Sequence, residues 1–277
     1  MRLIFDPGFH YAFATAIVAM AISLVIYIKN KNTFPNPAVK AVAKEGETLV
    51  EMDIKEVRQR MYALFAVFAV VIFFWFSFHQ NGLTLTFFAK EYTDLNLFGM
   101  NIAAELFQSL NPFFVVFLTP VIMAIFAWQR ARGTEPSTPK KIAIGMGIAA
   151  SAYIVMAIGS YFSNLPLHAD IVAAGTSPVK VTPMLLMLTY LILTVAELYI
   201  SPLGISFVSK VAPPKYQGIM QGGWLAATAI GNQLLFIGAI LYETVPIWLT
   251  WTVFVVACSI SMITMLCMLK WLERVAK

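Results

Sequence analysis

The run PMLLMLTYLILTVAELYISPLGISF, residues 183–207, decides the fold class of this chain. It exceeds the roughly 20 apolar residues that a helix needs to cross a bilayer. Glu197 lies near its middle. Placing an acidic side chain at that depth of the bilayer costs a few kcal/mol of free energy, so such acids usually face a water-filled cavity and bind a ligand or an ion there. Pro202 and Gly204 follow one to two turns further on, and kinked backbone at membrane depth is tolerated only where protein or a cavity surrounds it. The run therefore predicts a membrane protein with a polar cavity.

The composition is that of an integral membrane protein. Hydrophobic residues make up 60% of the 277 residues, charged residues make up 12%, and the mean hydropathy is +0.78. A soluble domain carries about 25% charged residues. The formal net charge of +5 comes from basic residues in short connections between apolar runs, so we expect no nucleic-acid partner.

Apolar runs of span length recur along the whole chain. Seven of them lie near 9–28, 61–89, 103–128, 142–163, 183–209, 218–241 and 247–270. The connections between them are alternately rich and poor in lysine and arginine, and the rich side is cytoplasmic by the positive-inside rule. We therefore expect a multi-pass protein of the inner (plasma) membrane, with the amino terminus of this chain outside and its carboxyl terminus in the cytoplasm.

The connection at 29–60 is much longer than the others. It is a polar linker that leads into a helical extension at 52–60. A twelve-span chain with two six-span halves would have this pattern if its first five spans were removed. What remains would be one span, a long cytoplasmic linker and six spans. The expected organisation is a single span at 1–30, a cytoplasmic linker at 31–60 and a six-helix bundle at 61–277. A seven-helix receptor-like protein is the rival, but it does not explain the one dominant connection.

Polar side chains gather in the second and third predicted spans. His79 and Gln80 lie in the second, and His79 is a candidate proton carrier because histidine titrates near neutral pH. A neutral histidine that hydrogen-bonds between helices is the alternative. Asn111 and Pro112 lie in the third, where Pro112 leaves a carbonyl one turn earlier without its backbone partner. That carbonyl and the Asn111 amide are candidate ligand contacts, and an interhelical hydrogen bond by Asn111 is the alternative. Glu105 and Lys90, near the predicted outer mouth, are candidate gate residues.

Small residues mark the sixth predicted span. Gly218 and Gly222 form a small-xxx-small pair, as do Ala227 and Gly231, and such pairs let a neighbouring helix approach closely. Trp224 lies too deep for an interfacial aromatic belt, so lining a pocket and packing between helices stay open as alternatives. The residues expected to kink helices or to pack them closely are Pro112, Pro202, Gly218, Gly222 and Gly231.

Nothing in the sequence suggests an enzyme. The chain has no G-x-S-x-G, no H-E-x-x-H, no phosphate-binding loop and no cluster of histidine and cysteine ligands. We therefore expect no catalytic residues, no metal site and no cofactor.

Several stretches resemble the proton-coupled oligopeptide transporter family of the major facilitator superfamily. Their order and spacing match spans seven, eight, ten and eleven of that family: FWFSFHQNG (74–82), QSLNP (108–112), AELYISPLGISFV (196–208), APP (212–214) and GGWLAATAIGN (222–232). Residues 10–28 look like its span six. The resemblance covers nearly the whole chain, but only the carboxyl-terminal half of a family member. It implies an all-α integral membrane fold with about seven transmembrane helices, span six plus the carboxyl-terminal six-helix bundle.

The resemblance also implies roles for single residues. Glu197 matches the acid that receives the amino terminus of a peptide, and Asn111 matches an asparagine that contacts the peptide backbone. Trp224 matches an aromatic residue that lines the pocket, and Gln80 matches a glutamine that we expect at the same site. His79 and Glu197 are the expected proton-coupling and gating groups, although His79 stands where family members commonly carry an acid.

The expected function is therefore proton-coupled symport of di- and tripeptides across the inner membrane. Its partners would be small peptides, protons, the lipid bilayer and an amino-terminal five-span portion that nothing in this chain replaces. Alternating access needs two bundles, so we expect the chain to be inactive for transport by itself. The alternatives are a non-transporting sensor or assembly protein, and a major facilitator half for another small zwitterionic solute.

Overall fold

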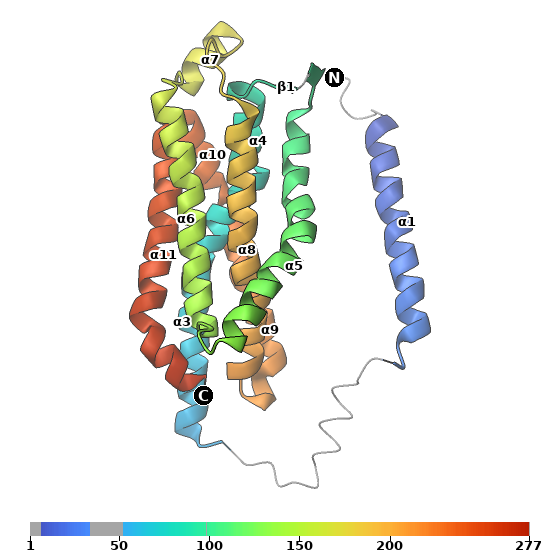
Figure 1. Ribbon diagram of the computed structural model, residues 1–277, viewed down its shortest axis with the longest axis vertical. Helices are drawn as coiled ribbons and strands as arrows, with labels where there is room; N and C mark the ends of the chain where they lie inside the picture. Colours follow the sequence, from blue (N-terminus) through green and yellow to red (C-terminus); the bar gives the residue numbers. More distant parts are fainter. Residues whose placement is uncertain (1–6, 34–51, 98, 277) are drawn as a thin grey trace. The chain divides into compact units, whose positions relative to one another are not determined.

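The computed structural model describes residues 7–33, 52–97 and 99–276 of the chain. Helices dominate these residues (Figure 1). In chain order the elements are α1 (Pro7–Asn30), α3 (Ile54–Phe78), the 3-10 helix η1 (His79–Gly82), α4 (Thr84–Tyr92), β1 (Asn96–Leu97), β2 (Met100–Asn101), the 3-10 helix η2 (Ala104–Ser109), α5 (Leu110–Ala131), α6 (Thr138–Phe162), α7 (His168–Ala174), α8 (Pro183–Val211), the 3-10 helix η3 (Pro214–Tyr216), α9 (Gln217–Gln233), α10 (Leu235–Thr244) and α11 (Ile247–Val275).

Seven helical segments within the described residues are long and apolar enough to cross a membrane. They lie at Phe13–Asn30, Ile54–Tyr92, Ala104–Ala131, Thr138–Phe162, Pro183–Val211, Pro214–Thr244 and Ile247–Val275. Each corresponds to one of the seven apolar runs in the sequence. The expected all-α fold with seven spans is therefore confirmed.

The chain forms two separate units, residues 1–52 and residues 53–277. The first contains α1, whose 24 residues give a helix of about 36 Å, enough to cross a hydrocarbon core of about 30 Å. The predicted linker at 31–60 falls largely on residues 34–51, which lie outside the described part of the chain. The predicted helical extension at 52–60 is the first part of α3, which continues from Ile54 into the span.

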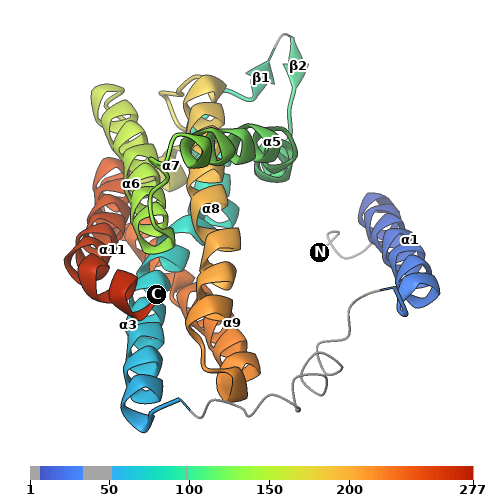
Figure 2. The same cartoon turned by 60° about the horizontal axis from the view of Figure 1, so that its bottom comes forward.

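The second unit is a bundle in which α6 packs against both α8 and α11 (Figures 1 and 2). Between α6 and α11, the ring of Trp251 stacks on Tyr153 with a centroid distance of 6.1 Å, and its indole nitrogen donates to the Ser160 hydroxyl at 3.1 Å. Between α6 and α8, a Cβ added at Gly145 would lie 2.7 Å from a side-chain carbon of Ile200. In addition, α3 packs against α9 and α11, and α5 packs against α8.

Breaks interrupt two of the membrane spans. The helix of the second span ends at Phe78, passes through η1 and resumes as α4 at Thr84. The sixth span is broken between α9 and α10 at Leu234. The third span starts as the 3-10 helix η2 before α5 begins at Leu110. Irregular backbone at membrane depth needs protein or a cavity around it. The break at η1 is therefore a candidate position for a binding pocket.

Short elements connect the ends of the spans. The helix α7 lies between α6 and α8, and His168 at its start contacts Glu91 of α4, with 3.1 Å between Nδ1 and Oε2. The hydroxyl of Tyr242, from α10, donates to the same carboxylate oxygen at 2.8 Å. These contacts hold α4, α7 and α10 together at one end of the bundle, and the sequence did not predict α7 or the β1–β2 hairpin.

The connection between α5 and α6 is held by a carboxylate. Glu135 accepts hydrogen bonds from Arg130, at 2.8 and 3.0 Å, and from Lys141 at 2.5 Å. The hydrogen bond from Arg130, and then that from Lys141, lowers the pKa of Glu135 from 4.5 to about 2. The neighbouring Ser137 hydroxyl donates to Glu273 of α11.

Candidate functional site

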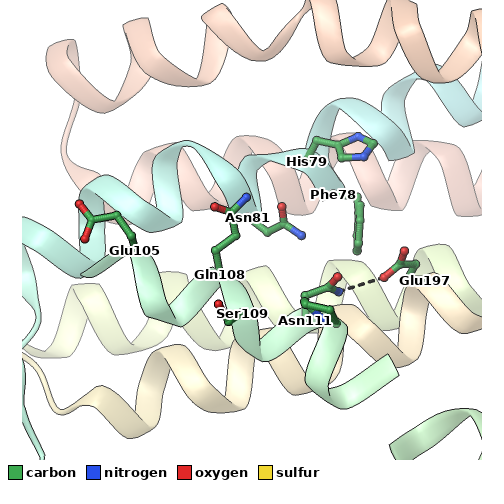
Figure 3. A pocket seen from close by; sticks show the side chains of 9 residues that line it. Phe78, His79, Asn81, Glu105, Gln108, Ser109, Asn111 and Glu197 are labelled. Carbon is green, nitrogen blue, oxygen red and sulfur yellow. Dashed lines mark hydrogen bonds between the residues drawn. The ribbon is translucent and has the colours of Figure 1, made fainter. Parts of the chain in front are cut away.

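A pocket of about 460 Å³ opens beside the break in the second span. Figure 3 shows Glu105 and Glu197 at opposite ends of the group of side chains that line it. The lining residues are Phe78, His79, Asn81, Glu105, Gln108, Ser109, Asn111, Pro112 and Glu197. They come from the end of α3, from η1, η2 and the first turn of α5, and from the middle of α8. Three spans therefore build the pocket.

Gly82 allows two of these segments to meet. It ends η1, and a Cβ added there would lie 2.9 Å from Nε2 of Gln108 on η2. The hydroxyl of Tyr190, from α8, donates to the backbone carbonyl of Asn81 at 2.6 Å. This carbonyl lies in the broken part of the span, so Tyr190 supplies a donor that a continuous helix would have provided from its own backbone.

Asn111 and Glu197 contact each other across α5 and α8 (Figure 3). The side-chain nitrogen of Asn111 donates to Oε2 of Glu197 at 2.9 Å and to the hydroxyl oxygen of Thr194 at 3.1 Å. Glu197 is half-buried, and Thr194 is fully buried. The two polar residues that the sequence placed in different spans thus lie in hydrogen-bond contact at one pocket.

His79 lines the same pocket from the first position of η1. Its ring stacks on Trp75, with 5.0 Å between ring centroids, and its Nδ1 lies 3.2 Å from the backbone oxygen of Trp75. The ring is half-buried and is held by its own helix. The structure therefore brings His79, Asn111 and Glu197 together around one cavity.

Gln80 and Trp224 lie outside the pocket lining. Gln80 is fully buried; its Nε2 donates to the backbone oxygen of Leu235 at 3.4 Å, and its Oε1 accepts from the Thr84 hydroxyl at 3.0 Å. Trp224 is 2% exposed and packs on Gly204 of α8, where an added Cβ would lie 2.0 Å from the indole ring. Both side chains fill helix contacts in the described part of the chain.

The prolines and glycines that the sequence predicts at helix kinks and close helix contacts lie in different environments. Pro112 lines the pocket as the third residue of α5, and Pro202 lies inside α8, which continues to Val211. Gly231 contacts the backbone of α3, where an added Cβ would lie 2.9 Å from the Ile72 oxygen. A Cβ added at Gly218 or Gly222 would meet no atom within 4 Å, so the described residues show no close packing at these two glycines.

Sequence reasoning gave no role to Thr194. Its position three residues before Glu197 places both side chains on one face of α8, and that spacing was the available signal. Asn81, Gln108 and Ser109 also line the pocket, and each belongs to a polar stretch recognised in the sequence.

The chemistry of the pocket suits a cationic group. Glu105 and Glu197 are carboxylates, whereas the lining within the described residues includes no lysine or arginine. No group of three or more histidine, cysteine, aspartate or glutamate side chains in the described part of the chain is placed to hold a metal ion.

A bundle of membrane-spanning helices, with a polar pocket where one of them is broken, is an arrangement that many membrane transporters use. The chain belongs to the POT family: residues 38–252 match the family model described as PTR2: POT family. The resemblance seen in the sequence is confirmed, and the chain is a multi-pass member of a transporter family, not an enzyme.

The chain is similar to part of several larger proteins. Peptide transporter YePEPT of Yersinia enterocolitica subsp. palearctica serotype O:3 (strain YE-P4) is 30% identical over 175 residues, 63% of this chain and 32% of that protein. Dipeptide and tripeptide permease A of Yersinia pestis is 30% identical over 172 residues, 62% of this chain and 31% of that protein. A crystal structure of a mutant of peptide transporter POT in complex with alafosfalin aligns with a TM-score of 0.68 at 22% identity, covering 98% of this chain and 54% of that chain. The chain thus spans about a third of these curated relatives and about half of the solved structure.

Proposed function

We propose that this chain supplies the carboxyl-terminal bundle, with span six and its linker, of a transporter that moves di- and tripeptides together with protons. Residues 1–30 would be span six, 31–60 the linker and 61–277 the six-helix bundle. The observation that carries the proposal is the contact of Asn111 with Glu197 at the wall of the pocket.

Two acceptor atoms of this contact suit an ammonium group. The Asn111 nitrogen gives its hydrogens to Thr194 and Glu197, which leaves Oδ1 of Asn111 without a donor among the described residues. Oε1 of Glu197 likewise accepts no hydrogen bond in the described part of the chain. A carboxylate and an amide oxygen on one pocket wall can together accept hydrogen bonds from the –NH₃⁺ group at the amino terminus of a peptide.

The relatives support a peptide as the substrate. YePEPT is a peptide transporter by name, and the Yersinia pestis relative is named for dipeptides and tripeptides. A free peptide carries both an ammonium and a carboxylate, and the described lining of this pocket includes carboxylates for the ammonium but no lysine or arginine for the carboxylate.

Glu197 and His79 are the proposed proton-coupling groups. Both line the pocket, and both can bind a proton there. Protonation of Glu197 removes the charge that holds the ammonium group, so uptake of a proton and release of the peptide are linked through one carboxylate. In this proposal the lysine- and arginine-rich connections face the cytoplasm, with the carboxyl terminus inside and the amino terminus of this chain outside.

The test is peptide binding to the chain in lipid nanodiscs, with labelled alanyl-alanine as the probe. Glu197→Gln keeps the size of the side chain but removes its charge. A hydrogen bond to a charged group contributes about 1.5–3 kcal/mol, so binding should weaken roughly 10- to 100-fold. Glu243→Gln, on an exposed side chain at the end of α10, is the matched control and should bind like the parent. Unchanged binding by Glu197→Gln would refute the proposed site.

Transport is tested separately from binding. Cells that express this chain alone should not concentrate labelled alanyl-alanine, because alternating access requires a second bundle. Concentrative uptake by the chain alone would contradict the proposal that it is one part of the transport unit.

A further inference from the structure

Thr194 contacts Asn111 and accepts a hydrogen bond from it, because its own proton is given to a backbone carbonyl. The Thr194 hydroxyl donates its single proton to the backbone oxygen of Tyr190, one turn earlier on α8, at 2.8 Å. Its oxygen is then an acceptor for the Asn111 nitrogen, at 3.1 Å. The hydroxyl is buried, so water does not compete for it.

This arrangement fixes which end of the Asn111 amide points to α8. With the amide turned by half a rotation, its oxygen would face the oxygens of Thr194 and Glu197, and acceptors do not pair with acceptors. Glu197 alone does not keep the Asn111 amide in one orientation when Glu197 gains and loses a proton. A protonated carboxyl group can also donate to an amide oxygen. The Thr194 oxygen keeps the same role whether Glu197 is charged or neutral.

We propose that Thr194 is a positioning residue that keeps the amide oxygen of Asn111 directed at the substrate's ammonium group in both protonation states of Glu197. The proposal rests on the proposed function, since it needs an ammonium group in this pocket. It gives the pocket two acceptors when Glu197 is charged and one when it is neutral. Without Thr194, the amide can rotate when Glu197 is protonated and present its N–H groups to the ammonium.

Tyr190 connects Thr194 to the broken part of the second span. Tyr190, whose carbonyl fixes the Thr194 proton, also donates through its hydroxyl to the Asn81 carbonyl in η1. One face of α8 therefore holds both the broken span and the amide of Asn111. The other titratable groups on the pocket wall are His79 from η1 and Glu105 from η2.

The experiment compares binding of alanyl-alanine and N-acetyl-alanyl-alanine to the chain in nanodiscs. Thr194→Val removes the hydroxyl at nearly constant shape, and at a pH that protonates Glu197 the preference for the free amino group should fall about three- to tenfold, the contribution of one hydrogen bond. Thr194→Ser restores the hydroxyl and should restore the preference. Thr189→Val is the matched control, because the buried Thr189 hydroxyl of the same helix donates only to its own backbone, at 2.8 Å to Leu185, and the preference should not change.

The outcomes separate this inference from the proposed function. If the parent chain binds both peptides equally, the ammonium site itself is wrong. If the parent prefers the free amino group and Thr194→Val keeps that preference, the site stands and the role of Thr194 is refuted. Thr194→Ala, which adds no methyl group, is the second variant, and thermal unfolding shows that each variant is folded before its preference is compared.

Discussion

Gly231 lets α9 approach the backbone of α3, and Gly231→Ala tests how much the bundle depends on that approach. A Cβ at this position would lie 2.7 Å from Cβ of Trp75, 2.9 Å from the oxygen of Ile72 and 3.0 Å from the nitrogen of Phe76. Carbon atoms in contact sit about 3.5–4.0 Å apart, so α9 would have to move from α3 by roughly 1 Å. Two of the three atoms belong to backbone and cannot rotate aside. We therefore expect the free energy of unfolding to fall by about 1–3 kcal/mol, the usual range for an overpacked interior.

Gly222→Ala is the matched control on the same helix. A Cβ there would meet no described atom within 4 Å, and alanine in place of a helical glycine stabilises by about 0.5–1 kcal/mol. Thermal unfolding of the two variants in the same detergent should give a lower Tm for Gly231→Ala and an unchanged or higher Tm for Gly222→Ala. Equal shifts in the two proteins would refute the reasoning, because they would show that the backbone contact with α3 has no special effect.

Two further substitutions test single hydrogen-bonded groups. Tyr190→Phe leaves the buried Asn81 carbonyl without its donor and should lower the free energy of unfolding by about 1–3 kcal/mol. The exposed Tyr161→Phe should change it by under about 0.5 kcal/mol in the same thermal unfolding assay, and equal effects would contradict the assignment. Glu135→Gln removes a carboxylate whose pKa is lowered to about 2, first by Arg130. Such a group stabilises the fold above its unfolded pKa of 4.5 and ceases to do so as the pH falls toward 2. The variant should therefore have a lower Tm than its parent at pH 7, and the difference should shrink below pH 4.5; a constant difference would be the contrary result.

The spans could be predicted because hydrocarbon imposes one simple demand on the sequence. Each spanning helix needs about 20 apolar residues, and the runs near 142–163 and 183–209 correspond to α6 (Thr138–Phe162) and α8 (Pro183–Val211). The breaks inside the spans were not predicted, since η1 and the change from α9 to α10 leave the average hydrophobicity of their runs unaffected.

The candidate site was predictable in part for a similar reason. An acid in an apolar run must be accommodated, so Glu197 stands out without any knowledge of its neighbours. Gln80 and Trp224 stand out in the same way, yet both fill helix contacts. Gln80 packs on Gly238 of α10 and Trp224 packs on Gly204 of α8, and no local pattern indicates which glycine lies opposite a given side chain.

The sequence by itself determined that the chain crosses a membrane, how many spans it has and which buried charge needs a partner, because these follow from the free energy of placing each residue in lipid. Only the tertiary structure decided that Asn111, Thr194 and Glu197 form one hydrogen-bonded group, with His79 on the same pocket. The physical reason is that hydrogen bonds act over about 3 Å, whereas α5 and α8 are separated by α6 and α7 along the chain.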